Sequence, residues 1–203
     1  MIAIIDYGMG NLRSVQAGLF YVGQESIITD DLNKIMDADA VVLPGVGAFG
    51  DAIKRLNDTG LGEAFCEAVN MGKPCIGICL GLQLLFSESE EGGLHKGLGI
   101  IKGKVVRFTN QLKVPHIGWN QLNIEQKEIP ILRDISDGTY VYFVHSYYVI
   151  PDDANAIATT TDYGIEFTSM IAKGNLFGTQ FHPEKSQSLG LQILRNFGSL
   201  ING

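Results

Sequence analysis

Residues 73–86 read KPCIGICLGLQLLF, and this stretch predicts the architecture of the chain around it. The β-rich run Cys75–Ile78 is typical of a buried strand, and the pattern over Leu80–Phe86 is typical of a helix. Cys79 stands between them, with a glycine two positions away on each side. A tight strand-to-helix turn strains its central residue, and side chains at the two glycine positions would collide with neighbouring backbone. The stretch therefore predicts an α/β sheet that displays Cys79 at the end of a strand.

The residues before this stretch alternate short β-rich runs with helical patterns. Strands are expected at Ile2–Ile5, Ser26–Thr29 and Ala40–Leu43, and helices at Leu12–Val22 and Asp51–Val69. This alternation is typical of βαβ units, which place their strands side by side in a parallel sheet.

From about Leu98 onward, strand patterns follow one another without helices between them. The expected strands are Gly103–Phe108, Gly118–Ile124, Tyr140–Ile150, Ile157–Thr161, Glu166–Ala172 and Leu176–Phe181. Turn residues at 162–164 and 173–175 favour antiparallel pairing for some of them. A last helical pattern, from Leu189 to Ile201, is expected to cover the sheet. We therefore expect one domain, residues 1–203, with a central mixed, mostly parallel sheet flanked by helices and with antiparallel C-terminal strands.

The composition disfavours several classes of function. The chain has 203 residues, 45% of them hydrophobic, which is enough for the core of one α/β domain. Its net charge of −7 disfavours nucleic acid and anionic membrane surfaces as partners. The apolar runs are too short for a signal peptide or for the roughly 20 residues of a membrane span. We therefore expect a soluble, cytoplasmic protein.

The three cysteines, Cys66, Cys75 and Cys79, are an odd number in a chain without an export signal, so no disulfide framework is expected. No Cys/His spacing resembles a zinc site, and we expect no metal or other cofactor. Cys79 could be a small buried apolar residue, as we expect of the other two. The glycines, strand and helix around it favour a nucleophile instead. N–H groups at the helix start would favour the thiolate, and that of Leu80 could stabilise an oxyanion.

A candidate base lies near the other end of the chain, where residues 178–186 read GTQFHPEKS. Pro183 disfavours helical geometry at His182, so His182 and Glu184 leave a stiff, extended segment. Glu184 can accept an imidazole N–H and stabilise the imidazolium once His182 takes a thiol proton. His145 is the strongest competing base, whereas His95 and His116 lack a comparable carboxylate nearby. The carboxylate partner favours His182.

A glycine-rich turn at residues 45–50, GVGAFG, matches the glycine spacing of a dinucleotide-binding loop. The match is weak because Pro44 opens the turn, the turn follows the third strand, and the next strand does not end in the required acidic residue. An unhindered loop beside a reactive thiol can instead offer N–H groups to an oxyanion, which is the function we predict for Gly45 to Gly47. A purely structural tight turn stays open as an alternative.

With these motifs placed, the chain resembles the class I, triad-type glutamine amidotransferases, which have a flavodoxin-like architecture. The resemblance rests on six blocks, which are residues 6–14 (DYGMGNLRS), 44–49 (PGVGAF), 77–86 (GICLGLQLLF), 116–120 (HIGWN), 142–147 (YFVHSY) and 178–186 (GTQFHPEKS). Gly-x-Cys-x-Gly together with His-Pro-Glu is specific for this family. The first and fourth blocks are more narrowly similar to the glutaminase subunits of imidazole glycerol phosphate synthases, although those have Met where this chain has Ile117.

The resemblance implies that L-glutamine is hydrolysed to glutamate and ammonia through a γ-glutamyl thioester on Cys79, with His182 and Glu184 completing a triad. It implies oxyanion contacts from Val46, Gly47 and Leu80. It also implies that the substrate is held by Gln83, Glu91, His145, Ser146 and Tyr147.

The resemblance further implies a heterodimer with a (β/α)₈-barrel cyclase, which would use the ammonia to make imidazole glycerol phosphate in histidine biosynthesis. The residues expected at that interface are Asn11, Trp119, Tyr142 and Lys185. Two alternatives stay open from the sequence, namely an amidotransferase subunit of another pathway and a non-catalytic nucleotide-binding module.

Overall fold

The structure is a computed structural model that describes residues 1–109 and 112–202 of the chain. Its amino-terminal half alternates strands and helices, as the sequence predicts. The strands are β1 (Ile2–Ile5), β2 (Ser26–Thr29), β3 (Ala40–Gly45) and β4 (Cys75–Cys79), and the helices are α1 (Leu12–Tyr21), α2 (Leu32–Asp37), α3 (Phe49–Thr59), α4 (Leu61–Asn70) and α5 (Leu80–Leu84). The four strands pair in parallel in the order β2-β1-β3-β4.

The second half consists largely of strands. They are β5 (Phe86–Ser89), β6 (His95–Lys96), β7 (Ile101–Arg107), β8 (His116–Gln121), β9 (Asn123–Ile124), β10 (Tyr140–His145), β11 (Tyr147–Pro151), β12 (Ile157–Asp162), β13 (Glu166–Lys173) and β14 (Leu176–Thr179). The remaining elements are α6 (Gln187–Ser199) and the 3-10 helices η1 (Pro130–Leu132), η2 (Ala154–Ala156), η3 (Pro183–Lys185) and η4 (Leu200–Asn202).

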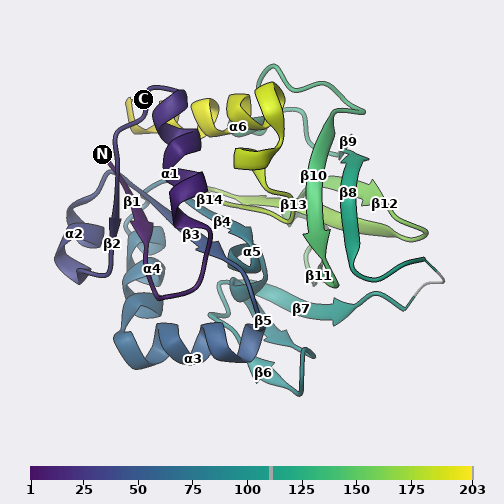
Figure 1. Ribbon diagram of the computed structural model, residues 1–203, viewed down its shortest axis with the longest axis horizontal. Helices are drawn as coiled ribbons and strands as arrows, with labels where there is room; N and C mark the ends of the chain where they lie inside the picture. Colours follow the sequence, from purple (N-terminus) through teal and green to yellow (C-terminus); the bar gives the residue numbers. More distant parts are fainter. Residues whose placement is uncertain (110–111, 203) are drawn as a thin grey trace.

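Strand β14 joins the two halves into one sheet. It pairs in parallel with β4 on one side and antiparallel with β13 on the other. The sheet then continues through β11, β7, β5 and β6, while β12 pairs with β13 and β9 pairs with the other edge of β12. Strands β8 and β10 form a separate antiparallel pair (Figure 1). The mixed sheet with antiparallel C-terminal strands is therefore confirmed.

Helices cover both faces of the large sheet (Figure 1). Alternate residues of β1 point to opposite faces, so Ile2 and Ile4 pack with α1 and α6, whereas Ala3 and Ile5 pack with α2, α3 and α4. Strand β4 leads into the elbow, the tight turn over residues 77–81 that carries Cys79, and is buried along its whole length. Cys79 is thus held by a rigid sheet that is covered on both sides.

Two of the predicted helices differ from the structure. The single helix predicted over Asp51–Val69 is wrong, because Gly60 adopts a left-handed conformation with φ of 75° and separates α3 from α4. The helix predicted over Leu80–Phe86 ends at Leu84, because Phe86 begins β5. Helix α2 was not predicted at all; it is short and buries only Ile35.

The strand predicted over Tyr140–Ile150 is also wrong as a single element. It is interrupted at Ser146, and its two parts, β10 and β11, belong to different sheets. The strand predicted over Gly118–Ile124 is likewise divided into β8 and β9, which pair with different partners. An alternating pattern continues unchanged when a chain passes from one sheet to another, so the sequence could not reveal these breaks. Within the described part of the chain, no helix has the length and apolar character needed to cross a membrane.

Candidate active site

Cys79 occupies a strained turn between β4 and α5. Its φ of 57° and ψ of −109° are unusual for a residue with a side chain. A Cβ atom at Gly77 would lie 2.6 Å from the carbonyl oxygen of Gly81, and one at Gly81 would lie 1.8 Å from that of Leu43. Both glycines are therefore required for the tight approach of backbone on which the turn depends, as the sequence predicts.

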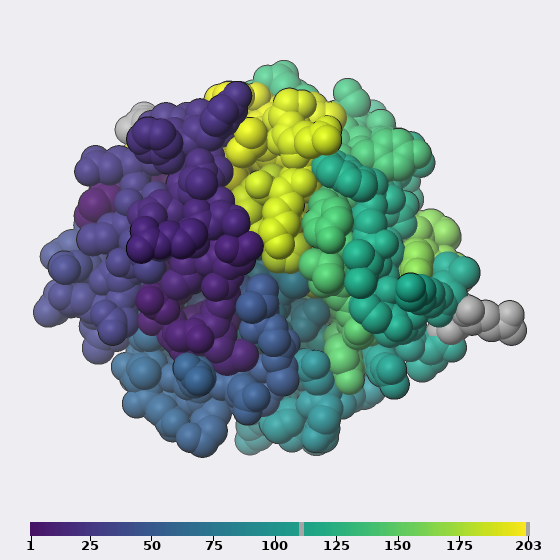
Figure 2. Space-filling view, viewed as in Figure 1, coloured from purple at the N-terminus to yellow at the C-terminus, as the bar shows by residue number. Residues whose placement is uncertain are grey.

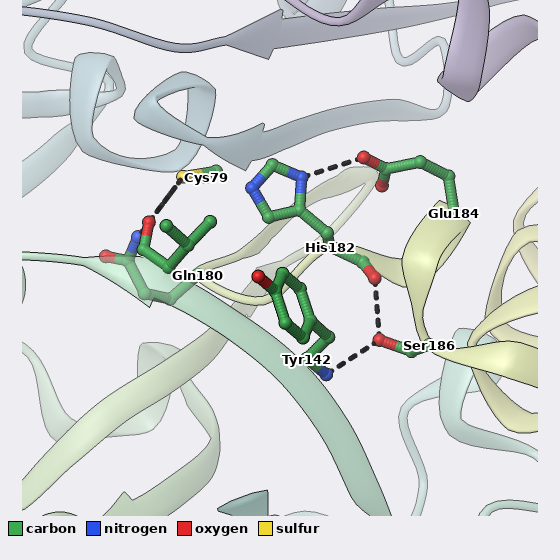
Figure 3. A network of polar contacts seen from close by, with 7 residues as sticks. Cys79, Tyr142, Gln180, His182, Glu184 and Ser186 are labelled. Carbon is green, nitrogen blue, oxygen red and sulfur yellow. Dashed lines mark hydrogen bonds and ion pairs between the residues drawn. The ribbon is translucent and has the colours of Figure 1, made fainter. Parts of the chain in front are cut away.

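The pairing of β4 with β14 explains how two distant segments of the chain meet. These neighbouring parallel strands are in register, with Ile78 opposite Thr179. The carboxyl ends of parallel strands lie at the same edge of a sheet, so Cys79 and the segment that follows β14 emerge side by side. In Figure 3, the imidazole of His182 points toward Cys79 from one side and toward Glu184 from the other.

His182 and Glu184 form a buried ion pair beside Cys79. Nδ1 of His182 lies 2.7 Å from Oε1 of Glu184, and the two side chains are only 3% and 1% exposed. Burial by itself lowers the pKa of His182, but hydrogen bonding and the negative charges of Cys79 and Glu184 outweigh it and raise that pKa to about 9. His182 is consequently protonated at neutral pH.

The other ring nitrogen of His182 faces the sulfur. This Nε2 atom is buried and makes no hydrogen bond of ordinary geometry with any residue in 1–109 or 112–202. Nε2 is free to give its proton to a ligand group that enters between the ring and the sulfur.

A cavity of about 330 Å³ opens over Cys79. Its lining includes all the residues predicted to form the oxyanion and substrate contacts, which are Val46, Gly47, Leu80, Gln83, Glu91, His145, Ser146 and Tyr147, together with Cys79, His182, Pro115 and Val144. A volume of this size suits a small-molecule ligand. The predicted residues come from six different elements and loops, and the fold brings them to one place.

Two glutamine side chains connect the cavity wall to the sulfur. Nε2 of Gln83 donates to the carbonyl of Tyr147 over 3.2 Å and to Oε1 of Gln180 over 3.1 Å. Nε2 of Gln180 in turn donates to Sγ of Cys79 over 3.8 Å (Figure 3). Both amide hydrogens of Gln83 are used, so its Oε1 is the atom left for a ligand.

Gln180 was not among the residues selected from the sequence. It is fully buried directly after β14, two residues before His182. A polar side chain at the end of an apolar strand was the available signal. Ser186 was missed as well; its hydroxyl donates to the carbonyl of His182 over 2.6 Å and accepts from the N–H of Tyr142 over 2.9 Å, which holds the base in position (Figure 3).

The glycine loop after β3 packs against the elbow. A Cβ atom at Gly45 would lie 2.9 Å from Cβ of Leu80 and 2.6 Å from the hydroxyl of Tyr7. Gly45 is thus needed for close packing of the loop against Leu80 and Tyr7. Gly47 has a φ of 97°, and Val46 is 42% exposed at the mouth of the cavity.

The loop is tied to the opposite wall of the cavity by Glu91. Its Oε2 accepts a hydrogen bond from the backbone N–H of Phe49, at the first residue of α3, over 2.8 Å. Glu91, which lines the cavity, therefore also anchors the start of the helix.

The residues predicted at the interface lie around η3. Trp119 is 44% exposed, and its ring centroid lies 6.1 Å from that of Tyr142. Lys185 is exposed in η3, and Asn11 is exposed where α1 begins. Helix α1 contacts η3, so both chain ends and the β8–β10 pair contribute to one face (Figure 2).

The three cysteines are free thiols with different surroundings. Burial raises the pKa of Cys75 to about 12, and burial is also the main cause of the raised pKa of Cys66. Neither residue lines the cavity over Cys79. Among residues 1–109 and 112–202, no group of three or more His, Cys, Asp or Glu side chains is placed to hold a metal ion.

Comparison with known proteins identifies the family to which the chain is similar. A family model described as glutamine amidotransferase class-I matches residues 3–200. The imidazole glycerol phosphate synthase subunit HisH of Syntrophotalea carbinolica is 54% identical, over 98% of this chain and 100% of that protein. The subunit of the same name from Geobacter sulfurreducens is 51% identical, over 98% of each chain.

Solved structures agree in fold at lower sequence similarity. A crystal structure of a glutamine amidotransferase superposes with a TM-score of 0.77 at 17% identity and covers 100% of this chain and 99% of its own. The structure of PurLQS from Thermotoga maritima gives a TM-score of 0.77 at 20% identity, over 99% of this chain and 97% of the other.

Proposed function

This chain belongs to the class-I glutamine amidotransferase family, and we propose that it is the glutaminase subunit of an imidazole glycerol phosphate synthase, in which Cys79 attacks L-glutamine and the released ammonia passes to a cyclase subunit. The observation that carries the proposal is the meeting of Cys79 with the His182–Glu184 pair at the edge of one cavity. The names of the relatives support the pathway, which is histidine biosynthesis.

The first half of the reaction makes the thioester. Sγ of Cys79 attacks the carboxamide carbon of glutamine, and the carbonyl oxygen becomes an oxyanion. The N–H of Leu80 begins α5 and has no acceptor within that helix, so it can donate to this oxyanion, with the backbone at Val46 and Gly47 as the second side of the site. His182 gives its Nε2 proton to the departing nitrogen, which leaves as ammonia.

The second half releases glutamate. Neutral His182 now takes a proton from a water molecule, whose oxygen attacks the thioester carbon. Collapse of the second tetrahedral intermediate expels the thiolate of Cys79 and leaves glutamate in the cavity. Glu184 keeps the ring in one orientation and stabilises the imidazolium at both ends of the cycle. Glutamine and water are thus converted to glutamate and ammonia with no cofactor.

The wall opposite the triad suits the amino-acid end of the substrate. Glu91 carries a negative charge and Gln83 has Oε1 available, and both can accept hydrogen bonds from the α-ammonium group. Backbone groups of Ser146 and Tyr147 and the ring of His145 complete that side of the cavity. We propose the (β/α)₈ cyclase as the partner and the face with Asn11, Trp119, Tyr142 and Lys185 as its docking surface.

The test uses the chain mixed with the cyclase and its ribonucleotide substrate. Glutamine hydrolysis is expected to rise strongly on mixing and to be lost in Cys79→Ala, while that variant still binds the cyclase. Cys66→Ala is the matched control and is expected to keep full turnover. Full turnover in Cys79→Ala would end the proposal. Turnover that responds to a different acceptor enzyme would favour an amidotransferase of another pathway.

A further inference from the structure

A second group of polar side chains lies beside the triad, and one of its members, His116, has no part in the mechanism above. His116 on β8 and His145 on β10 face each other as a cross-strand pair, with Nδ1 of His116 3.0 Å from Nε2 of His145. They are only 3% and 5% exposed. His145 lines the glutamine cavity, whereas His116 does not.

Both histidines are neutral. Burial lowers the pKa of His116 to about 4. Burial is also the main cause that lowers the pKa of His145 to about 3, although its hydrogen bond to Tyr147 opposes the shift. Each ring therefore has one nitrogen that donates and one that accepts, and its tautomer is set by its neighbours.

The direction of every hydrogen bond in this group follows from its two ends. The carbonyl of Tyr147 can only accept, so Nδ1 of His145, 2.8 Å away, must carry the proton. Nε2 of His145 is then an acceptor, and Nδ1 of His116 must be the donor. Nε2 of His116 is left to accept from the side-chain amide of Asn120 over 3.4 Å. The amide nitrogen of Asn120 also donates to the carbonyl of Asp162 over 2.8 Å, which agrees with this orientation.

The inner end of this chain of hydrogen bonds reaches the substrate cavity. The carbonyl of Tyr147 accepts from both His145 and Gln83, so its two lone pairs are used. Gln83 continues through Gln180 to the sulfur of Cys79. If His145 took the other tautomer, its bare Nδ1 would face the carbonyl oxygen at 2.8 Å and push Tyr147 and Gln83 out of place.

We propose that His116 is a positioning residue for the glutamine pocket: by donating to His145 it fixes the tautomer that holds the Tyr147 carbonyl, and through it Gln83, in the arrangement that binds the substrate. This inference rests on the proposed glutaminase function. It assigns to His116 an effect on substrate affinity and none on the chemical step, because His116 touches neither the substrate nor the triad.

The competing explanation is that His116 only fills space. Its ring stacks on Tyr163, with centroids 3.9 Å apart, and on Phe143, with centroids 4.9 Å apart. Two substitutions separate packing from hydrogen bonding. His116→Phe keeps an aromatic ring and loses the donor. His116→Asn loses the ring and keeps an amide N–H near the position of Nδ1.

The first experiment measures alkylation of Cys79 by a glutamine analogue that carries a diazoketone in place of the carboxamide. In His116→Phe, the concentration for half-maximal labelling is expected to rise about tenfold, the ratio typical of one unmade buried hydrogen bond, with the limiting rate within twofold of wild type. His116→Asn is expected to stay within threefold of wild type on both measures. An unchanged half-maximal concentration in His116→Phe, or a larger effect in His116→Asn than in His116→Phe, would overturn the proposal.

The second experiment needs no catalytic activity. The chain has four histidines, so nitrogen NMR of the wild-type protein with labelled histidine can identify each tautomer. His116 and His145 are both expected to be neutral with the proton on Nδ1, and His145 is expected to lose this preference in His116→Phe. A proton on Nε2 of either ring in the wild type would overturn the proposal. Because this readout is independent of catalysis, failure of Cys79 to react with the analogue would count against the glutaminase function alone.

Discussion

Two histidines, His182 and His145, line the same cavity and are almost equally buried, yet their pKa values move in opposite directions. Burial lowers the pKa of both. For His182, hydrogen bonding and charge interactions with Cys79 and Glu184 outweigh burial and raise the pKa to about 9, whereas the pKa of His145 falls to about 3. The comparison shows that the partner of the ring, and not its burial, decides which histidine is protonated at neutral pH.

The partners differ in charge and in kind. Nδ1 of His182 faces a carboxylate that stabilises the imidazolium, and its Nε2 faces the reactive sulfur. Nδ1 of His145 faces a backbone carbonyl, its Nε2 faces neutral His116, and the positive charge of His182 disfavours a second one nearby. One ring is paired with a carboxylate, and the other is held as a fixed hydrogen-bonding group.

The largest expected effect comes from replacing each ring by the same amide. Asparagine keeps an N–H near the position of Nδ1, so His182→Asn retains a donor to Glu184 and His145→Asn retains one to Tyr147. His182→Asn should lower kcat for glutamine hydrolysis by roughly 10⁴-fold, the upper range for loss of a general acid and base. His145→Asn should change kcat and KM by only a few fold. Steady-state kinetics of the cyclase complex measure both variants. Equal losses of kcat in the two variants would contradict the different functions assigned to the two rings.

A smaller effect is expected from Glu184→Gln, which removes the charge behind His182 and keeps the shape. The pKa of His182 should fall, so the ring loses its proton at a lower pH and is less able to protonate the departing nitrogen. We expect kcat to drop by about 10²-fold. The alkaline limb of the pH profile should also move to lower pH. A profile that keeps its alkaline limb in place would show that Glu184 does not set the pKa of His182.

The same contrast predicts a loss of stability in acid. The pKa values of His145 and His116, about 3 and 4, lie below the value of about 6.5 expected in the unfolded chain. Their contribution is present above pH 6.5 and is lost as the pH falls toward 4, because the unfolded chain takes up the protons. Tm should decrease by several degrees between pH 7 and pH 4.5. The decrease should be smaller in His145→Asn, and an identical decrease in that variant would contradict a buried neutral ring.

The smallest effect is expected on the alkaline side. The pKa of His182 is raised above its unfolded value, so its contribution to stability is complete below pH 6.5 and disappears as the pH rises through about 9. Tm of the wild type should fall by a few degrees between pH 7 and pH 9. Thermal denaturation of His182→Asn over this range provides the control and should show a weaker dependence on pH.

The sequence predicted those features that follow from local pattern. The elbow around Cys79 could be read from its two glycines, and the His182–Glu184 pair from the proline between its members. The break at Gly60 and the change of sheet at Ser146 could not, because they depend on which neighbours the chain meets after folding.

The partner of each histidine also lay outside what the sequence could give. A carboxylate near His182 was visible in the chain, and the prediction of His182 over His145 as the base rests on it. The opposing pair of His145 and His116 arises from the register of β10 and β8, two strands that the sequence does not align. Gln180 was missed although it is a polar residue at the end of an apolar strand, because its importance comes from contacts with Gln83 and Cys79.

The most direct test of the account uses the three cysteines as internal controls. The wild-type chain is treated with the diazoketone analogue of glutamine in the cyclase complex, and the labelled site is mapped by peptide mass spectrometry. Label is expected on Cys79 alone, at a rate that falls at least a hundredfold in His182→Asn. Label on Cys66 or Cys75, or an equal rate of labelling in His182→Asn, would contradict the claim that sulfur and imidazole work as one unit.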